Sequence, residues 1–138
     1  MATTINNITV PLIGYEPGKT WSGSYDGDYQ GKGFAKLVLD HIWGLNKTTY
    51  KKGDFHDIKG KLKSLFPGSM VTVHWKPGKI KGWQYHSFIV EKKSSSGITV
   101  YDCNFSDTDE IDERFWKWTD FTNRFDYITS VQVPDTTA

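Results

Sequence analysis

The chain has 138 residues, a formal net charge of +1 and 15% aromatic residues. This length is sufficient to bury a sizeable core, so we expect residues 1–138 to form a single domain. The balanced charge argues against nucleic acid as the main partner, and no apolar run approaches the roughly 18 residues that a membrane helix needs. The single cysteine, Cys103, excludes an internal disulfide.

The first half of the chain predicts a short strand and two helices. The strand is expected at residues 8–13. Apolar residues at helical spacing predict a helix over about 33–43, which ends at Gly44. A shorter helix is expected over 57–66, where Pro67-Gly68 would stop it.

The second half predicts an antiparallel meander. Strands are expected at 70–75, 83–91, 98–104 and 127–133, with an acidic loop at 107–113 and an aromatic-rich turn or short helix at 114–121. A helix followed by a run of strands is typical of an α+β domain. We expect one central helix packed on an antiparallel sheet of five or six strands.

Two neighbouring strands of this meander carry the best candidate for a reactive pair. Matching their apolar residues sets Val90 against Ile98, which places His86 opposite Asp102 with Asn104 diagonal to it. A carboxylate holds an imidazole in one tautomer, as a general base requires. The alternative interpretation is an ordinary exposed ion pair at the end of a hairpin.

Two further features bear on the chemistry. Cys103 falls on the opposite face from His86, so we expect a buried, apolar-like residue rather than a nucleophile. Gly31 and Gly33 stand at the start of the first helix, where each costs roughly 1 kcal/mol relative to alanine. Two glycines in one turn indicate either close packing or a missing side chain.

Three motifs together resemble the papain-like amidohydrolases of the CHAP (cysteine, histidine-dependent amidohydrolase/peptidase) and NlpC type. These are Gln30-Gly31-Lys32-Gly33-Phe34-Ala35, His86-Ser87-Phe88-Ile89-Val90 and Val100-Tyr101-Asp102-Cys103-Asn104-Phe105. Pro67-Gly68 before Met70 is also similar to the family pattern. The resemblance implies a compact papain-like fold, and the family's catalytic cysteine falls on Gly31.

The resemblance also implies a role for each matched residue. His86 would be the general base and Asp102 its orienting partner, with Asn104 as the alternative orienter. Gln30 would border the oxyanion site. From their positions before the helix start and before His86, Trp21 and Trp83 are candidates for a substrate groove.

The implied activity is thiol-dependent hydrolysis of an amide bond in peptidoglycan or a peptide, without a cofactor. With Gly31 at the nucleophile position the chain is expected to be inactive. The otherwise intact site favours an engineered Cys→Gly replacement, with a natural pseudoenzyme that binds wall fragments or a protein partner as the alternative. A phage-borne or injected toxin of the same fold is a third hypothesis. We expect a monomer that acts at the cell wall or outside the cell.

No metal site is predicted. His41, His56 and His74 have no partners at the spacing of metal ligands. Asp26 and Asp28 precede the first helix, but two carboxylates are too few for calcium, which takes six to eight oxygen ligands. We therefore interpret their segment as a turn.

Overall fold

The computed structural model describes residues 14–79, 84–105 and 108–135. The predicted strand at 8–13 lies outside these residues. The elements in chain order are β1 (Ser24–Tyr25), β2 (Asp28–Tyr29), α1 (Gln30–Ile42), a short 3-10 helix (Leu45–Lys47), β3 (Thr48–Phe55), α2 (Ile58–Ser64), β4 (Met70–Trp75), β5 (Tyr85–Lys93), β6 (Gly97–Cys103), β7 (Ile111–Lys117), α3 (Trp118–Arg124) and β8 (Phe125–Pro134). The predicted α+β class is confirmed.

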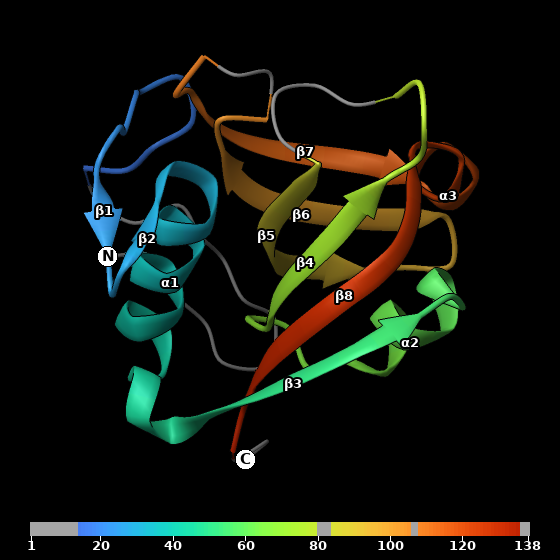
Figure 1. Cartoon of the computed structure of the whole chain (residues 1–138), viewed down its shortest axis with the longest axis horizontal. Helices are drawn as coiled ribbons and strands as arrows, with labels where there is room; N and C mark the ends of the chain where they lie inside the picture. The colour runs from blue at the N-terminus through green and yellow to red at the C-terminus, as the bar shows by residue number, and fades with distance from the viewer. Residues whose placement is uncertain (1–13, 80–83, 106–107, 136–138) are drawn as a thin grey trace.

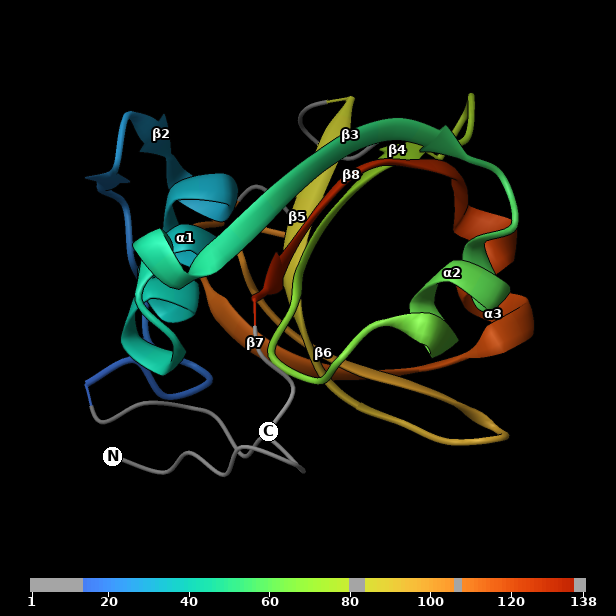
Figure 2. The same cartoon turned by 90° about the horizontal axis from the view of Figure 1, so that it is seen from below.

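Six strands form one antiparallel sheet in the order β3-β8-β4-β5-β6-β7, and β1 pairs with β2 in a separate hairpin. Figure 1 shows α1 beside this sheet, with the N-terminal hairpin next to it. Figure 2 shows that the sheet curls, with α2 and α3 on its concave side and α1 outside the curl. No helix of the described residues is both long and apolar enough to cross a membrane.

The sheet separates two hydrophobic clusters. The first lies on the concave side, where residues of α2 and α3 pack against one face of the strands, among them Trp75, Phe88 and Phe121. The second lies under α1, where Phe34 and Val38 pack against alternate residues of the same strands. Side chains of a strand alternate between faces, so each central strand contributes to both clusters.

The pairing of β5 with β6 differs from the predicted register. Val90 lies opposite Val100 rather than Ile98, and a bulge between Val90 and Lys92 shifts the pairing further along. In the part of the pairing that contains Asp102, the observed register differs from the predicted one by two residues. A shift of two residues leaves every side chain on its expected face. His86 is therefore diagonal to Asp102 rather than directly opposite it.

Two edge strands were not predicted. β3 carries mostly exposed, polar residues, so it lacks the apolar alternation that indicates a strand. β7 replaces the predicted acidic loop from Ile111 onward, and only Trp118–Arg124 is helical in the segment expected as an aromatic-rich turn. Both strands lie at edges of the sheet, where only one neighbour is available and one-sided burial leaves a weak pattern.

Candidate functional site

The imidazole of His86 and the carboxylate of Asp102 form a buried pair. His86 Nε2 lies 2.9 Å from Asp102 Oδ2, and the two side chains are 7% and 1% exposed. An ionised carboxylate can only accept, so Nε2 is the donor to Asp102, and Nδ1 is the ring nitrogen that does not face the carboxylate. Nδ1 has no hydrogen-bond partner among the described residues. The pair is thus built as a general base would be, and it is not the exposed ion pair of the alternative interpretation.

The guanidinium of Arg114 lies next to the carboxylate of Asp102. Arg114 Nε lies 3.8 Å from Asp102 Oδ2, and its Nη2 donates to Asp112 Oδ2 at 2.5 Å. The guanidinium also lies 4.0 Å from the centre of the Phe105 ring. The guanidinium is thus held between Asp112 and the Phe105 ring, next to the buried carboxylate of Asp102.

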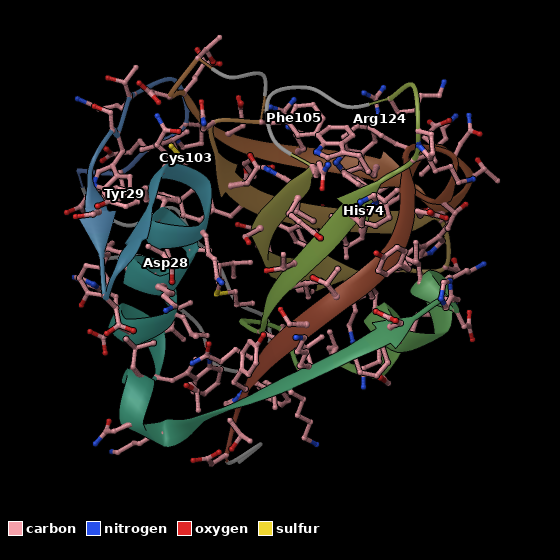
Figure 3. All side chains as sticks on the ribbon, in the orientation of Figure 1. Asp28, Tyr29, His74, Cys103, Phe105 and Arg124 are labelled. Carbon is pink, nitrogen blue, oxygen red and sulfur yellow. The ribbon has the colours of Figure 1, made fainter. Side chains whose placement is uncertain are left out.

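Aromatic rings fix the orientation of His86. Phe105 meets the imidazole edge-on at 5.3 Å, and Trp75 and Phe88 lie 6.3 and 6.4 Å away between ring centroids. Figure 3 shows Phe105 and Arg124 close together at this end of the sheet. A ring packed on several sides has few alternative rotamers, so His86 is held ready for one direction of proton transfer.

The two glycines at the start of α1 differ in what surrounds them. A Cβ at Gly33 would lie 2.4 Å from the carbonyl oxygen of Asp28, so this glycine is required by close packing. A Cβ at Gly31 would lie 3.0 Å from the carbonyl oxygen of Cys103, and that neighbour would need to move by a few tenths of an ångström. Gly31 has no positive φ, so its backbone suits an L residue. Gly31 is therefore the less obstructed of the two positions.

Three side chains beside Gly31 form a strained cluster. Gln30 Nε2 donates to Asp109 Oδ1 at 2.8 Å, and Asn104 Nδ2 donates to Gln30 Oε1 at 3.0 Å. Asn104 Oδ1 in turn accepts from the backbone N–H of Asp109 at 2.8 Å. Among the non-glycine residues that the structure describes, these three and Asp26 have a positive φ. Such strain costs about 1–3 kcal/mol per residue and is concentrated at functional sites.

The cluster assigns different partners to the two candidate orienting residues. Asp102 contacts His86, whereas Asn104 is bonded to Gln30 and Asp109. Asp109 belongs to the segment that was expected to be an acidic loop, and it was not among the predicted site residues. Neither spacing nor strand pattern in the sequence could link it to Gln30, since a tertiary contact across 79 residues joins them.

Cys103 is buried in the cluster under α1, as predicted. Its Sγ lies 3.4 Å from the carbonyl oxygens of both Trp21 and Asp109. Burial, with further contributions from the negative charges of Asp102 and Asp109, raises the pKa of this thiol to about 12. A thiol that stays protonated is a poor nucleophile.

A cavity of about 680 Å³ connects the start of α1 with His86. Gln30, Gly31, His86 and Asn104 line it at one end. From there it runs over the α1 side of the sheet. Its dimensions are within the range of ligand-binding clefts.

The remainder of the cavity has a hydroxyl floor and tyrosine walls. Thr72 pairs with Ser87 on one side and Ser130 on the other, and Thr72 Oγ1 lies 2.7 Å from Ser87 Oγ. The walls are formed by Tyr29, Tyr50, Tyr85 and Tyr127. The first three are 75%, 53% and 51% exposed. Exposed aromatic rings around a polar floor suit an extended substrate that carries both apolar and hydroxyl groups.

These tyrosines were missed in the sequence, and the predicted aromatic groove residues lie elsewhere. Trp21 is absent from the lining of this cavity, and its ring packs on Phe34 at 5.8 Å. Trp83 lies outside the described residues. The polar positions Thr72 and Ser87 within otherwise apolar strands were the signal that could have located the groove.

The structure describes no group of three or more His, Cys, Asp or Glu residues that could hold a metal. His74 stacks on Tyr127 at 5.1 Å, and the tilted ring of His56 lies 5.2 Å from the same tyrosine. Asp26 and Asp28 both contact Lys36, at 3.2 and 2.6 Å. Their charges are thus met by a lysine, in agreement with the interpretation of this segment as a turn.

Comparisons with known proteins leave the family open. No family model matches the sequence, and no curated protein matches it. Among solved structures, "The crystal structure of Ly7917" aligns with 89% of this chain at 16% identity and a TM-score of 0.42. The chain spans 42% of the length of that structure. The functional argument therefore depends on the geometry of the site.

Proposed function

We propose that this domain follows the compact papain-like plan of the CHAP and NlpC-type amidohydrolases. In this proposal it is a thiol-dependent hydrolase of amide bonds in peptidoglycan or a peptide, and residue 31 is the nucleophile position. The observation that carries the proposal is that His86, held by the buried carboxylate of Asp102, lines one cavity together with the start of α1. With Gly31 the chain binds this substrate without cleaving it.

The chemistry requires a cysteine at position 31. His86 Nδ1 would take the thiol proton, and the positive end of the α1 dipole would favour the thiolate. The sulfur would then attack the amide carbonyl carbon, and the protonated His86 would give its proton to the leaving amine as the C–N bond breaks. Water would hydrolyse the resulting thioester. Without the nucleophile such a unit loses on the order of a millionfold in rate.

The cluster beside Gly31 supports an oxyanion site. Backbone N–H groups at the start of a helix have no intrahelical partner, so they can donate to a developing negative charge. The Gln30 amide is oriented by Asn104 and Asp109, and only one of its two N–H groups is used by Asp109. The other is available to the oxyanion. Asn104 then acts as a positioning residue through Gln30, while Asp102 orients His86.

The experiment compares Gly31→Cys with Gly31→Ala. Both add the Cβ that approaches the Cys103 carbonyl, and only the first adds a thiol. We expect Gly31→Cys to release new amines from purified peptidoglycan or casein, and Gly31→Ala to release none. Adding His86→Ala to Gly31→Cys should abolish turnover, whereas His41→Ala, on the exposed surface of α1, should leave it unchanged.

A second measurement needs no substrate. The rate of iodoacetamide labelling against pH reports the pKa of the introduced thiol, because buried Cys103 stays protonated. We expect a pKa below that of a free cysteine, which returns to the ordinary value in the His86→Ala background. An ordinary pKa in both backgrounds would rule out the proposed nucleophile position.

The second candidate function is a binding module that uses the same cavity. It is favoured by the tyrosine walls and hydroxyl floor, which need no nucleophile. A Gly31→Cys variant that folds, binds wall fragments and has an activated thiol but no turnover would favour this function over the hydrolase.

A further inference from the structure

We infer that a second surface, remote from the cavity at His86, binds a linear phosphodiester polymer of the bacterial cell wall. This lysine face consists of Lys51 on β3, Lys59, Lys61 and Lys63 on α2, and Lys93 at the end of β5. The choice of a wall polymer rests on the proposed function. The binding of phosphodiesters by these lysines does not rest on the proposed function.

Although the net charge is only +1, the basic and acidic residues are concentrated in different parts of the chain. Eleven of the 17 basic residues lie between residues 47 and 93, together with three acidic ones. Residues 94–138 contain nine acidic and three basic residues. The segment that forms β3, α2, β4 and β5 is therefore strongly cationic, and such a local field attracts anions whatever the overall charge.

Three members of the lysine face share a cavity of about 430 Å³. Lys51, Lys61 and Lys93 line it, and its other lining residues include no aspartate or glutamate. Lys51 faces this cavity, whereas its neighbours Tyr50 and Lys52 line the cavity at His86. The alternation of β3 thus separates the two surfaces onto opposite sides of the sheet.

The lysine stems are held in place while their charges remain uncompensated. Lys61 Nζ lies 4.4 Å from the centre of the Phe55 ring, and Lys59 and Lys63 each lie 5.9 Å from that of Trp118. Lys93 Nζ donates to the carbonyl oxygens of Lys63 and Leu65, and burial lowers its pKa.

No carboxylate of the described residues forms an ion pair with any of these five lysines. The nearby Asp57 instead caps α2 by accepting from the Gly60 N–H at 3.1 Å. A cluster of like charges is unfavourable by itself, so an anionic ligand would relieve the repulsion.

The side-chain types favour a phosphate polymer without bases. Lysine binds phosphate as a point charge, whereas base edges and planar carboxylates are recognised best by the arginine fork. Both arginines are occupied elsewhere, since Arg114 lies over Phe105 and Arg124 lies over Trp116. Single-stranded nucleic acid also needs exposed rings for stacking. The most exposed aromatic residues that the structure describes, Tyr29, Tyr50, Tyr85 and Phe115, are absent from this cavity.

The test measures binding of fluorescently labelled poly(glycerol phosphate) by anisotropy at several salt concentrations. The test variant is Lys51→Gln/Lys61→Gln/Lys63→Gln. The matched control is Lys19→Gln/Lys79→Gln/Lys117→Gln, which removes the same charge from exposed positions outside the lysine face. We expect the test variant to bind at least about tenfold more weakly. The slope of log K against log salt should be reduced by roughly 2 to 3, and the control should bind like the parent chain.

Three results would overturn the inference. The first is that the parent chain fails to bind the polymer. The second is that both triple variants lose affinity equally, which would indicate that binding depends on net charge alone. The third is that a single-stranded oligonucleotide of equal charge binds the parent chain as tightly as the polymer does and loses the same affinity in the test variant. This would assign the face to nucleic acid. Urea unfolding verifies that both variants are folded. Because this readout involves no turnover, failure of the hydrolase proposal leaves it unaffected.

Discussion

The two faces of the curled sheet have opposite characters. The concave face encloses His86 and Asp102 among packed aromatic rings, with Arg114 behind the carboxylate. The outer face carries α1 and most of the cavity, with its exposed tyrosines and hydroxyl floor, and the cavity reaches His86 only at one end. The group that would move a proton is thus part of the rigid core, whereas the surface that would recognise a substrate is solvated. Substitutions on the two faces should therefore affect different quantities.

The largest expected effect is on catalysis in the Gly31→Cys background. Asp102→Asn removes the charge that orients His86, so kcat/KM should fall on the order of ten-thousandfold. Asn104→Ala disturbs only the positioning of Gln30, and its effect should stay below the roughly hundredfold loss typical of a missing oxyanion donor. Amine-release kinetics measure both. A larger loss for Asn104→Ala than for Asp102→Asn would assign the orienting role to Asn104 instead.

The next effect separates stability from binding. Phe88→Ala empties a fully buried position on the concave face and should lower the free energy of unfolding by about 3–5 kcal/mol. Tyr50→Ala on the outer face should change it by less than about 1 kcal/mol. Urea unfolding gives both values.

Tyr50→Ala should nevertheless weaken binding of wall fragments to the parent chain by more than about 1 kcal/mol, because an exposed ring that lines the cavity is removed. The matched control is Phe115→Ala, a residue of similar exposure (55% against 53%) on β7, outside the cavity. Calorimetry with soluble fragments should detect no change for this control. Equal losses for the two variants would show that the tyrosine walls have no specific role.

The smallest effect is a pH dependence at Cys103. Its folded pKa is raised from 9.0 to about 12, so above pH 9 the unfolded chain releases a proton that the folded chain retains. Stability should therefore fall as pH rises from 9 towards 12, by on the order of 1 kcal/mol at pH 10. Urea unfolding of the parent chain and of Cys103→Ala at pH 8 and 10 isolates the contribution of Cys103 to stability, since all other titrating groups are present in both proteins. Identical pH dependence in the two proteins would contradict the raised pKa.

Several elements could be predicted because their signals are local. The strand Met70–Trp75 was predicted with its observed bounds, since its apolar run ends at clear turn residues. The face shared by His86, Phe88 and Val90 also followed from strand periodicity. The edge strands β3 and β7 could not be predicted in this way, because few of their residues are buried, and β3 also pairs with a strand far away in the chain.

The sequence by itself determined the α+β class, the start of a helix with two glycines, and a histidine and an aspartate on matching strand faces. These depend on short-range periodicity and turn residues. Only the tertiary structure decided the register, which a bulge after Val90 shifts, and the diagonal contact between His86 and Asp102. It also decided that Gly33 is required by close packing while Gly31 is less obstructed. The physical reason is the same in each case: contacts between different elements set these distances, and the periodicity within one element does not encode them.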